Sequence, residues 1–556
     1  MEMENFYQRF CKEGFDENGV LNYFEPLPAD NFNFAYDVVD EIARLDPNRR
    51  AMVWCNVDGE ERIFTFGEMK HYSDCCAQML TAHGIKKGDM VLLVLKRHYE
   101  FWFTVLALHK IGAVGVPATN LLTTHDLVYR FKAAGVTACV CSGERCQVPE
   151  YVDEAIKEYP HIKTKFIVRG HREGWLDYAE EMKKFDGNWE RIPTSKDDPM
   201  LLYFTSGTTG MPKMAVHNMA YPLAHIITAR YWHNVHEGDL HLTVSETGWM
   251  KAVWGKLYGQ WLACASIFVY DFDKFVPGDL LHMMEKYKVT TFCAPPTIYR
   301  FFIKEGMEGY NLSSLRYSTT AGEALNPEVY NRWYEYTGLR LMESYGQTET
   351  VMQVGNLVGM MPKPGSMGKP SPLYDIHLVD EDGNDVPTGA TGEIVINTEK
   401  PHAGLFNGYY QNPEATSAAW HDGYYHTGDT AWRDEDGYLW YVGRTDDVIK
   451  SSGYRIGPFE IESVLMEHPA VLECAVTGAP DPVRGIVVKA TIVLTSSYQP
   501  SEELKKELQT FVKKQTAPYK YPRIVEFVAE LPKTISGKIR RTEIRAKDRQ
   551  NAQISQ

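Results

Sequence analysis

The sequence predicts an α/β protein in which a large N-terminal domain of parallel-sheet subdomains and a β-barrel-like subdomain precedes a small α+β C-terminal domain. Amphipathic stretches alternate with short apolar runs from about residue 64 to residue 298, a pattern typical of βαβ units. Short strands between tight turns follow, and the last ~110 residues have the pattern of a separate small unit. We place the two domains at residues 1–445 and 446–556.

The helices and strands of the large domain follow from hydrophobic periodicity and from glycine-containing turns. Asp382-Gly383 and Asp436-Gly437 are such turns, and they favour an antiparallel or barrel-like arrangement of the strands around them. In chain order, we expect a helix at 66–83, a strand at 90–95, a helix at 100–110 and strands at 113–117, 376–380, 393–397 and 438–442.

The C-terminal unit has the same two kinds of pattern over a shorter length. We expect it to contain a helix at 458–467, strands at 471–477 and 488–494, and a helix at 501–515. The apolar runs of the chain fall short of the ~20 residues that a membrane helix requires, so we expect no integral membrane segment.

Composition excludes several classes of function. The 58 basic against 73 acidic residues give a net charge of −15, which makes nucleic acid an unlikely partner. Residues 1–14 lack the basic start and apolar core of a secretory signal, so we expect a cytoplasmic location.

Among the ten cysteines, Cys139, Cys141 and Cys146 form the tightest cluster. Because no finger-like partner pair follows, we interpret them as buried structural residues.

The most informative segment is Thr205-Ser-Gly-Thr-Thr-Gly-Met-Pro-Lys213, which follows an apolar strand. Glycines allow several backbone N–H groups to point at one anion, and the hydroxyl groups add further donors. Lys213 supplies a positive charge for the outer phosphates of a nucleotide. The Gly-Lys-Ser/Thr of a Walker A loop is missing, so the segment predicts a phosphate-binding loop of another kind.

This segment resembles the phosphate-binding signature of the adenylate-forming superfamily, which includes acyl-CoA synthetases, luciferases and peptide-synthetase adenylation domains. Four more segments resemble family signatures in the family's order: Glu343–Thr350 (adenine and magnesium), Tyr425–Asp429 (ribose), Gly443–Lys450 (hinge) and Leu531–Lys538 (catalytic lysine). The segments Ser452–Pro458 and Ala517–Pro522 are most similar to the branch of acetyl- and medium-chain acyl-CoA synthetases.

The resemblance implies two half-reactions that use ATP, Mg²⁺ and coenzyme A. A carboxylate first becomes an acyl-adenylate, and a thiol then displaces AMP. It implies catalytic roles for Lys538, Lys213 and Glu349, with Glu349 and Thr208 as the metal ligands. The ATP-binding residues it implies are Thr205, Ser206, Gly207, Thr208, Thr209, Gly210, Lys213, Gly322, Glu323, Ala324, Glu343, Ser344, Tyr345, Gly346, Gln347, Thr348, Asp429, Arg444, Arg455 and Lys538.

In this family the C-terminal domain rotates between the two half-reactions, about a hinge residue that matches Asp446. Lys538 would neutralise the attacking carboxylate and the α-phosphate before the rotation. After it, coenzyme A would enter where the lysine had been. The coenzyme A-binding residues implied by the resemblance are Ser452, Gly453, Tyr454, Arg484 and Lys514.

The resemblance also locates an acyl pocket, formed by Trp249, Met250, Lys251, Trp254, Ala321 and Gly346. Enzymes restricted to acetate have a tryptophan at the position of Gly346, so we expect an open pocket floor that accepts acids longer than acetate. Trp254 could instead cap the pocket from the opposite wall, and the sequence leaves the direction of Lys251 open. We expect a short-to-medium-chain or branched carboxylic acid as the substrate.

Other functions stay open on the sequence alone. An aromatic-acid CoA ligase of the benzoate kind, and an adenylation enzyme that loads a separate carrier protein, are the main alternatives. Luciferase-like oxidation and a non-enzymatic nucleotide-binding regulator are further ones, although the regulator should have lost Glu349 or Lys538. The resemblance also allows a homodimer.

Overall fold

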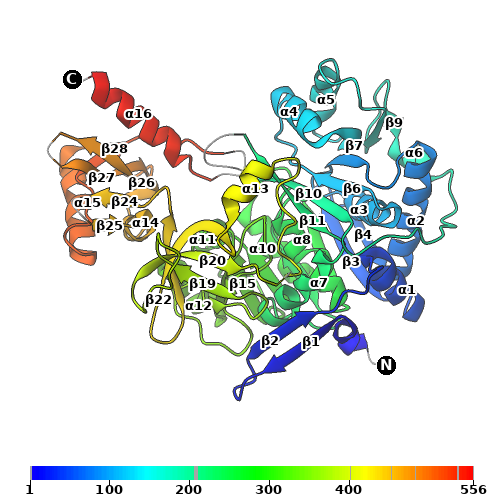
Figure 1. The fold of residues 1–556 in the computed structure, drawn as a ribbon, viewed down its shortest axis with the longest axis horizontal. Coiled ribbons are helices and arrows are strands. Elements are labelled where there is room, and N and C mark those ends of the chain that lie inside the picture. The colour runs from blue at the N-terminus through cyan, green and yellow to red at the C-terminus, as the bar shows by residue number, and fades with distance from the viewer. Residues whose placement is uncertain are drawn as a thin grey trace. The chain divides into compact units, whose positions relative to one another are not determined.

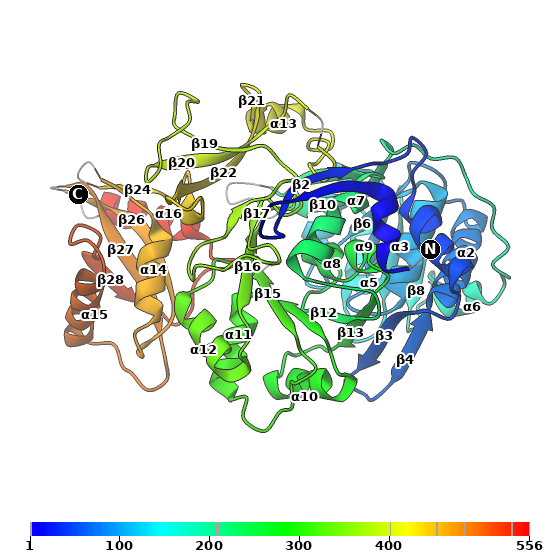
Figure 2. The ribbon, with the colours of Figure 1, turned by 90° about the horizontal axis from the view of Figure 1, so that it is seen from below.

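The computed structural model describes residues 3–205, 211–400, 402–451, 454–482, 484–534 and 538–554. The chain divides into two compact units (Figures 1 and 2). The first contains Met1–Thr205, Lys213–Tyr374 and Lys400–Ala418, and the second contains Ser206–Pro212, Asp375–Glu399 and Ala419–Gln556. The expected α/β class is confirmed, whereas the border at 445/446 stays a prediction.

The first unit contains a seven-stranded sheet in the order β11-β10-β6-β5-β7-β8-β9. Its strands pair in parallel except for the antiparallel hairpin of β10 and β11. Helices α4 and α5 lie against β7 (Figure 1). The strands are β5 (Met90–Val94), β6 (Val114–Pro117), β7 (Val136–Ser142), β8 (Thr164–Val168), β9 (Leu176–Asp177), β10 (Pro199–Thr205) and β11 (Lys213–Asn218).

A nine-stranded sheet in the order β18-β17-β16-β15-β14-β12-β13-β3-β4 forms the rest of this unit's centre. Its six middle strands pair in parallel, and helices α10, α11 and α12 pack on it through one apolar core (Figure 2). The strands are β3 (Arg50–Asn56), β4 (Glu61–Thr65), β12 (Leu240–Thr243), β13 (Ser266–Asp271), β14 (Thr291–Ala294), β15 (Tyr317–Ala321), β16 (Leu341–Tyr345), β17 (Val354–Gly355) and β18 (Lys369–Pro370).

Local sequence explains where the helices of this unit begin and end. Thr65 and Thr123 each form a capping box, with Glu68 and Asp126, at the start of a helix, and Gly112 ends another in the left-handed conformation. A hairpin of β1 (Cys11–Phe15) and β2 (Leu21–Pro26) lies near the N-terminus. The helices are η1 (Met3–Phe10), η2 (Ala35–Asp40), α1 (Glu41–Leu45), α2 (Phe66–Ala82), α3 (Glu100–Ile111), α4 (Thr124–Ala134), α5 (Val148–Ile156), α6 (Tyr178–Met182), α7 (Tyr221–Ile226), η3 (Ile227–Trp232), α8 (Lys251–Gly255), α9 (Tyr258–Leu262), α10 (Pro277–Tyr287), α11 (Pro296–Glu305), α12 (Pro327–Thr337) and α13 (Pro413–Ala419).

A buried histidine joins the two sheets of the first unit. The Nδ1 atom of His98 lies 2.8 Å from Oδ2 of Asp271, at the end of β13. Its Nε2 atom lies 2.8 Å from the Ser142 hydroxyl, at the end of β7. All three side chains are buried, so this Ser-His-Asp group fixes the carboxyl ends of the two sheets to one another.

The second unit begins with an antiparallel sheet, as its turns predicted, and continues with an α+β part. That part holds a core between α14, α15 and the β26–β27 hairpin. The strands are β19 (Ile376–Val379), β20 (Thr391–Asn397), β21 (Trp420–His421), β22 (Tyr424–Arg433), β23 (Leu439–Arg444), β24 (Ile449–Ser451), β25 (Tyr454–Ile456), β26 (Val471–Asp481), β27 (Gly485–Leu494) and β28 (Ile524–Phe527), and the helices are α14 (Pro458–Met466), α15 (Glu502–Gln515) and α16 (Arg541–Ile554).

Three further features concern membrane spans, thiols and metal sites. Over the described ranges, each helix is too short or too polar to cross a bilayer. The ten cysteines are free thiols, and Cys139 and Cys141 are buried in β7 while Cys146 is partly buried. Within the same ranges no group of three or more His, Cys, Asp or Glu side chains could hold a metal ion.

Candidate active site

The predicted phosphate loop connects two hydrogen-bonded strands. Thr205 ends β10 and Lys213 begins β11, and the two residues face one another in the antiparallel register. The hairpin therefore brings the first and last residues of the motif together. The predicted contacts Ser206, Gly207, Thr208, Thr209 and Gly210 lie outside the described residues.

Tyr409 connects two of the three predicted catalytic residues. Its hydroxyl donates to Oε1 of Glu349 at 2.9 Å, and the Lys213 ammonium lies 4.9 Å from the centre of its ring. Glu349 is buried and Lys213 is exposed. The sequence did not single out Tyr409, because it lies far along the chain from Lys213 and Glu349 and outside the five segments that resemble family signatures. A carboxylate and an ammonium held on one ring are suited to bind Mg²⁺ and phosphate side by side.

The other nucleotide-binding residues of the first unit follow two neighbouring parallel strands. Gly322, Glu323 and Ala324 come directly after β15, and the predicted adenine segment begins within β16. Ala321 and Ser344 are paired in register, so the two segments lie at the same edge of the sheet. Ligands bind at such carboxyl ends in open α/β sheets.

Glu343 on β16 forms a hydrogen bond with the segment that follows β15. Its Oε1 atom accepts a hydrogen bond from the Leu325 backbone N–H at 3.0 Å, and its backbone carbonyl accepts from Asn356. The other carboxyl oxygen has no hydrogen-bond partner among the described residues, and burial raises the pKa of Glu343 to about 8. A neutral carboxyl therefore holds the segment after β15 to β16 at neutral pH.

The expectation of an open floor at Gly346 is wrong. A Cβ atom added there would lie 2.3 Å from Cη2 of Trp254 and 2.8 Å from the Val351 carbonyl oxygen. The indole of Trp254 therefore fills the space that the glycine leaves, and it is itself buried against Trp232 and His225. Two residues predicted for opposite walls of the acyl pocket, Gly346 and Trp254, therefore lie in contact.

The side chain of Lys251 points to the residues at the end of β15. Its ammonium donates to the Ala321 carbonyl oxygen at 2.6 Å and lies 3.9 Å from a Cβ position on Gly322, whose φ of +105° is left-handed. Burial lowers the pKa of Lys251. The start of α8 is thus connected to the end of β15, and Met250 is buried beside it while Trp249 is half-buried.

The predicted ribose residues lie together in the second unit. Asp429 on β22 and Arg444 on β23 are paired in register, and Oδ1 of Asp429 accepts from the Tyr441 hydroxyl at 3.0 Å. Arg444 also forms an ion pair of 3.2 Å with Asp446, the predicted hinge residue. Tyr441 is a second tyrosine that the sequence did not single out, although it lies on the same strand as Arg444.

The remaining predicted residues are on exposed parts of the second unit. The backbone N–H of Lys538 donates to the Thr534 hydroxyl at 3.1 Å, and its side chain is exposed. Tyr454 stacks on Tyr519 with ring centres 4.0 Å apart, and both rings are exposed. Arg484 and Lys514 are exposed, Arg455 lies on β25, and Ser452 and Gly453 lie outside the described residues.

The chain is similar to known proteins over nearly its whole length. Residues 39–410 match the model of the family "AMP-binding enzyme", and residues 460–538 match "AMP-binding enzyme C-terminal domain". It is 44% identical to acyl-coenzyme A synthetase ACSM4, mitochondrial, of Rattus norvegicus, and the aligned region covers 95% of this chain and 93% of the relative. It is 42% identical to acyl-coenzyme A synthetase ACSM3, mitochondrial, of Homo sapiens, over 93% of this chain and 90% of that protein.

Solved structures agree with these relatives. The anthranilate CoA ligase AuaEII in complex with anthranoyl-AMP superimposes with a TM-score of 0.86 at 29% identity, covering 95% of this chain and 99% of that chain. A benzoate CoA ligase from Burkholderia xenovorans LB400 superimposes with a TM-score of 0.79 at 27% identity, covering 92% and 100%. The curated relatives carry the word mitochondrial in their names, which contradicts the cytoplasmic location expected from the sequence.

Proposed function

Because this chain belongs to the AMP-binding enzymes, and within them to the acyl-coenzyme A synthetases, we propose that it activates short-to-medium-chain carboxylic acids. It is an acid–thiol ligase that uses ATP, Mg²⁺ and coenzyme A. A carboxylate oxygen attacks the α-phosphorus of ATP, and pyrophosphate leaves. The coenzyme A sulfur then attacks the acyl carbon, and AMP leaves with the oxygen that came from the acid.

The observation that carries the residue assignment is the contact of Lys213 and Glu349 with one tyrosine. The ammonium faces the ring of Tyr409 and the carboxylate accepts from its hydroxyl. In the proposed adenylation step, Lys213 neutralises the charge that grows on pyrophosphate. Glu349 would hold Mg²⁺, which supplies further charge for the phosphates when it is bound; Thr208 is the second proposed ligand.

Residues of the second unit are proposed for the other parts of the cycle. Asp429 would accept the ribose hydroxyls, because a carboxylate is a common acceptor for this group, and Arg444 is its partner in the strand register. Lys538 would serve adenylation, and Asp446 would be the hinge about which the C-terminal domain turns. The exposed ring of Tyr454 would face coenzyme A, and the exposed side chains of Arg484 and Lys514 are proposed as further contacts to it.

Trp254 supports the proposed acid class. The indole that fills the space beside Gly346 would form an apolar end wall of the proposed acyl pocket. Such a wall limits the length of a straight chain and favours compact acids, whether short, branched or aromatic. An aromatic acid is therefore a second candidate, supported by the similarity to the anthranilate and benzoate CoA ligases.

One experiment separates these candidates. Pyrophosphate release is measured with acetate, butyrate, 2-methylbutyrate, hexanoate, octanoate and benzoate, with and without coenzyme A. The proposal expects kcat/KM to be highest for one of the aliphatic acids of four to eight carbons and turnover to depend on coenzyme A, whereas a maximum at benzoate would favour the aromatic acid. A maximum at acetate, or turnover that is indifferent to coenzyme A, would contradict it. A homodimer is proposed only on the family resemblance, and light scattering after size exclusion tests it.

A further inference from the structure

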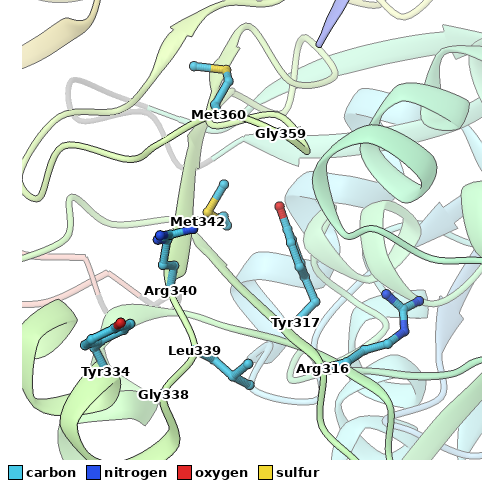
Figure 3. Close-up of a pocket in the computed structure, with 9 residues that line it drawn as sticks. All are labelled: Arg316, Tyr317, Tyr334, Gly338, Leu339, Arg340, Met342, Gly359 and Met360. Carbon is cyan, nitrogen blue, oxygen red and sulfur yellow. The ribbon is translucent and has the colours of Figure 1, made fainter. Parts of the chain in front are cut away.

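Figure 3 shows a cavity of the first unit with the residues that line it. The cavity lies at the end of the nine-stranded sheet opposite to the candidate active site. The predicted nucleotide residues follow the carboxyl ends of β15 and β16, whereas the cavity is formed where these strands begin. Four residue steps of a strand separate the two ends, which is roughly 13 Å. The cavity has a volume of about 340 Å³, and it is lined by Arg316, Tyr317, Tyr334, Gly338, Leu339, Arg340, Met342, Gly359 and Met360.

Two polar groups of this cavity have no partner among the described residues. The Tyr317 hydroxyl is shielded from solvent and has no hydrogen-bond partner. Burial raises the pKa of Tyr317, so the hydroxyl stays a neutral donor at physiological pH. Arg340 is exposed and forms no ion pair within the described part of the chain. Figure 3 shows the two side chains on either side of the cavity.

The second arginine is already neutralised. Arg316 forms an ion pair and hydrogen bonds with Asp239, and it donates to the Asn234 carbonyl oxygen at 2.6 Å. The cavity therefore offers one unpaired guanidinium and one hydroxyl donor, which together match a single negative charge. A phosphate dianion would need at least one more cation.

The rest of the lining is apolar. Leu339, Met342 and Met360 contribute aliphatic and thioether groups, and Met342 is buried. Tyr334, which also lines the cavity, is 48% exposed. Methionine adapts to ligands of different shape, and an exposed ring provides a surface on which a planar or branched body can pack.

We propose that this cavity is a second ligand site, which binds a small organic monocarboxylate through Arg340 and Tyr317 and packs its apolar body against Tyr334, Leu339 and Met342. The volume lies at the lower end of the range for small-molecule sites, which restricts the ligand to compact acids. The site does not depend on the catalytic assignment, because it uses none of the residues assigned to ATP, the acyl group or coenzyme A.

The test counts binding sites with the active site filled. The full-length protein is saturated with an acyl-sulfamoyl-adenosine analogue of acyl-AMP, and benzoate is titrated by isothermal calorimetry. The proposal expects one remaining benzoate site per chain. Arg340→Gln and Tyr317→Phe should each weaken it, the arginine change by about tenfold or more. Arg332→Gln, which removes a surface arginine of α12 paired with Glu335, should leave the site unchanged.

Two further arms define the ligand chemistry. Benzamide, the neutral analogue, should not bind, and inorganic phosphate should not displace benzoate. Displacement by phosphate would show a general anion site and overturn the assignment to carboxylates. Absence of a remaining benzoate site, or equal binding in all three variants, would overturn the proposal. Tyr317→Phe removes a buried hydroxyl without a partner, so the melting temperature of this variant should not fall. An unchanged melting temperature would show that weaker benzoate binding in the variant does not come from misfolding.

Discussion

Trp254 is the residue that most changes the view of the substrate pocket. A glycine at position 346 suggested an open floor, because acetate enzymes carry an indole there. The structure places an indole in the same space from the other direction, on α8. Sequence comparison at one position could not reveal this, since the space beside a glycine depends on a residue almost a hundred positions earlier in the chain.

Trp254→Ala should therefore extend the range of accepted acids. Each additional methylene that gains apolar contact is worth about 0.8 kcal/mol, or roughly fourfold in kcat/KM. The ratio of kcat/KM for octanoate over butyrate should rise in the variant, and a melting curve checks that it is folded. Gly346→Trp, which has no space for its side chain, should instead lower activity on all acids alike. An unchanged octanoate to butyrate ratio in Trp254→Ala would show that the acyl chain lies elsewhere.

Glu343 predicts a dependence of stability on pH. Its pKa in the folded protein is about 8, above the value near 4.3 that a free glutamate has. The folded chain therefore holds a proton that the unfolded chain loses, and stability decreases as pH rises through this window. Glu343→Gln keeps the acceptor for Leu325 and removes the titration.

The variant should gain stability over the wild-type protein by up to about 1.4 kcal/mol for each pH unit between about pH 5 and 8. Melting temperatures measured at pH 5.5, 6.5 and 7.5 provide the check. A difference between variant and wild type that stays constant across this range would contradict a neutral Glu343. The wild-type protein at each pH serves as the control for buffer effects.

At the scale of elements, the positions of helices and strands could be predicted, but the order of the strands could not. The helix expected at 66–83 is α2 and the strand expected at 90–95 is β5, each within one residue at either end. Hydrophobic periodicity and capping residues carry this information locally. The neighbours β13 and β3 are more than two hundred residues apart, and nothing in either strand's own sequence specifies that pairing.

In the candidate site, too, contacts between residues far apart in the chain could not be predicted from the sequence. Motif residues could be identified because their glycines, hydroxyls and charges are grouped in sequence. Tyr409 and Tyr441 were missed because their role arises from what they contact, namely Glu349 and Asp429. A tyrosine without a neighbouring signature is more often a core residue, so only the folded arrangement distinguishes these two.

Gly255 allows helix α8, which carries two residues predicted for the acyl pocket, to pack closely on strand β12. A Cβ atom there would lie 2.0 Å from Oγ1 and 2.5 Å from Cβ of Thr243, so helix α8 can lie on β12 only with glycine at this position. Gly255→Ala should push α8 from the sheet, at a cost of about 1–3 kcal/mol for overpacking. Since Lys251 and Trp254 lie on this helix, kcat/KM should fall together with the melting temperature.

Gly278→Ala on α10 is the matched control for this change. Its new Cβ would meet only the hydroxyl end of Tyr310 at 2.9 Å and the carboxylate of Glu305 at 3.6 Å, and both flexible side chains can move away. It should leave activity and melting temperature close to wild type. An equal effect of the two substitutions would mean that α8 does not need its close contact with β12.

At the scale of the whole molecule, the predicted catalytic residues are divided between two compact units. Lys213 and Glu349 belong to the first unit, and Lys538 belongs to the second. A catalytic group on a separate unit can serve one half-reaction and then make way for the other substrate. Asp446 itself lies inside the second unit, so the proposed rotation about this residue would divide that unit and stays a prediction.

Lys538→Ala should separate the half-reactions. Adenylation, measured as pyrophosphate release without coenzyme A, should fall by about 10²-fold or more, because a positive charge at the reacting phosphate is lost. Thiolysis of a supplied acyl-adenylate by coenzyme A should stay near the wild-type rate. Equal losses in both assays would indicate that Lys538 acts through the structure of its loop.

The passage of the acid through an acyl-adenylate is tested most directly by an oxygen label. The enzyme is supplied with ATP, coenzyme A and an accepted acid whose carboxylate oxygens are ¹⁸O, and the products are analysed by mass spectrometry. The account predicts acyl-CoA, unlabelled pyrophosphate and AMP that carries one ¹⁸O atom, because the attacking carboxylate oxygen stays on the α-phosphorus. Formation of ADP and phosphate, or AMP without the label, would contradict it.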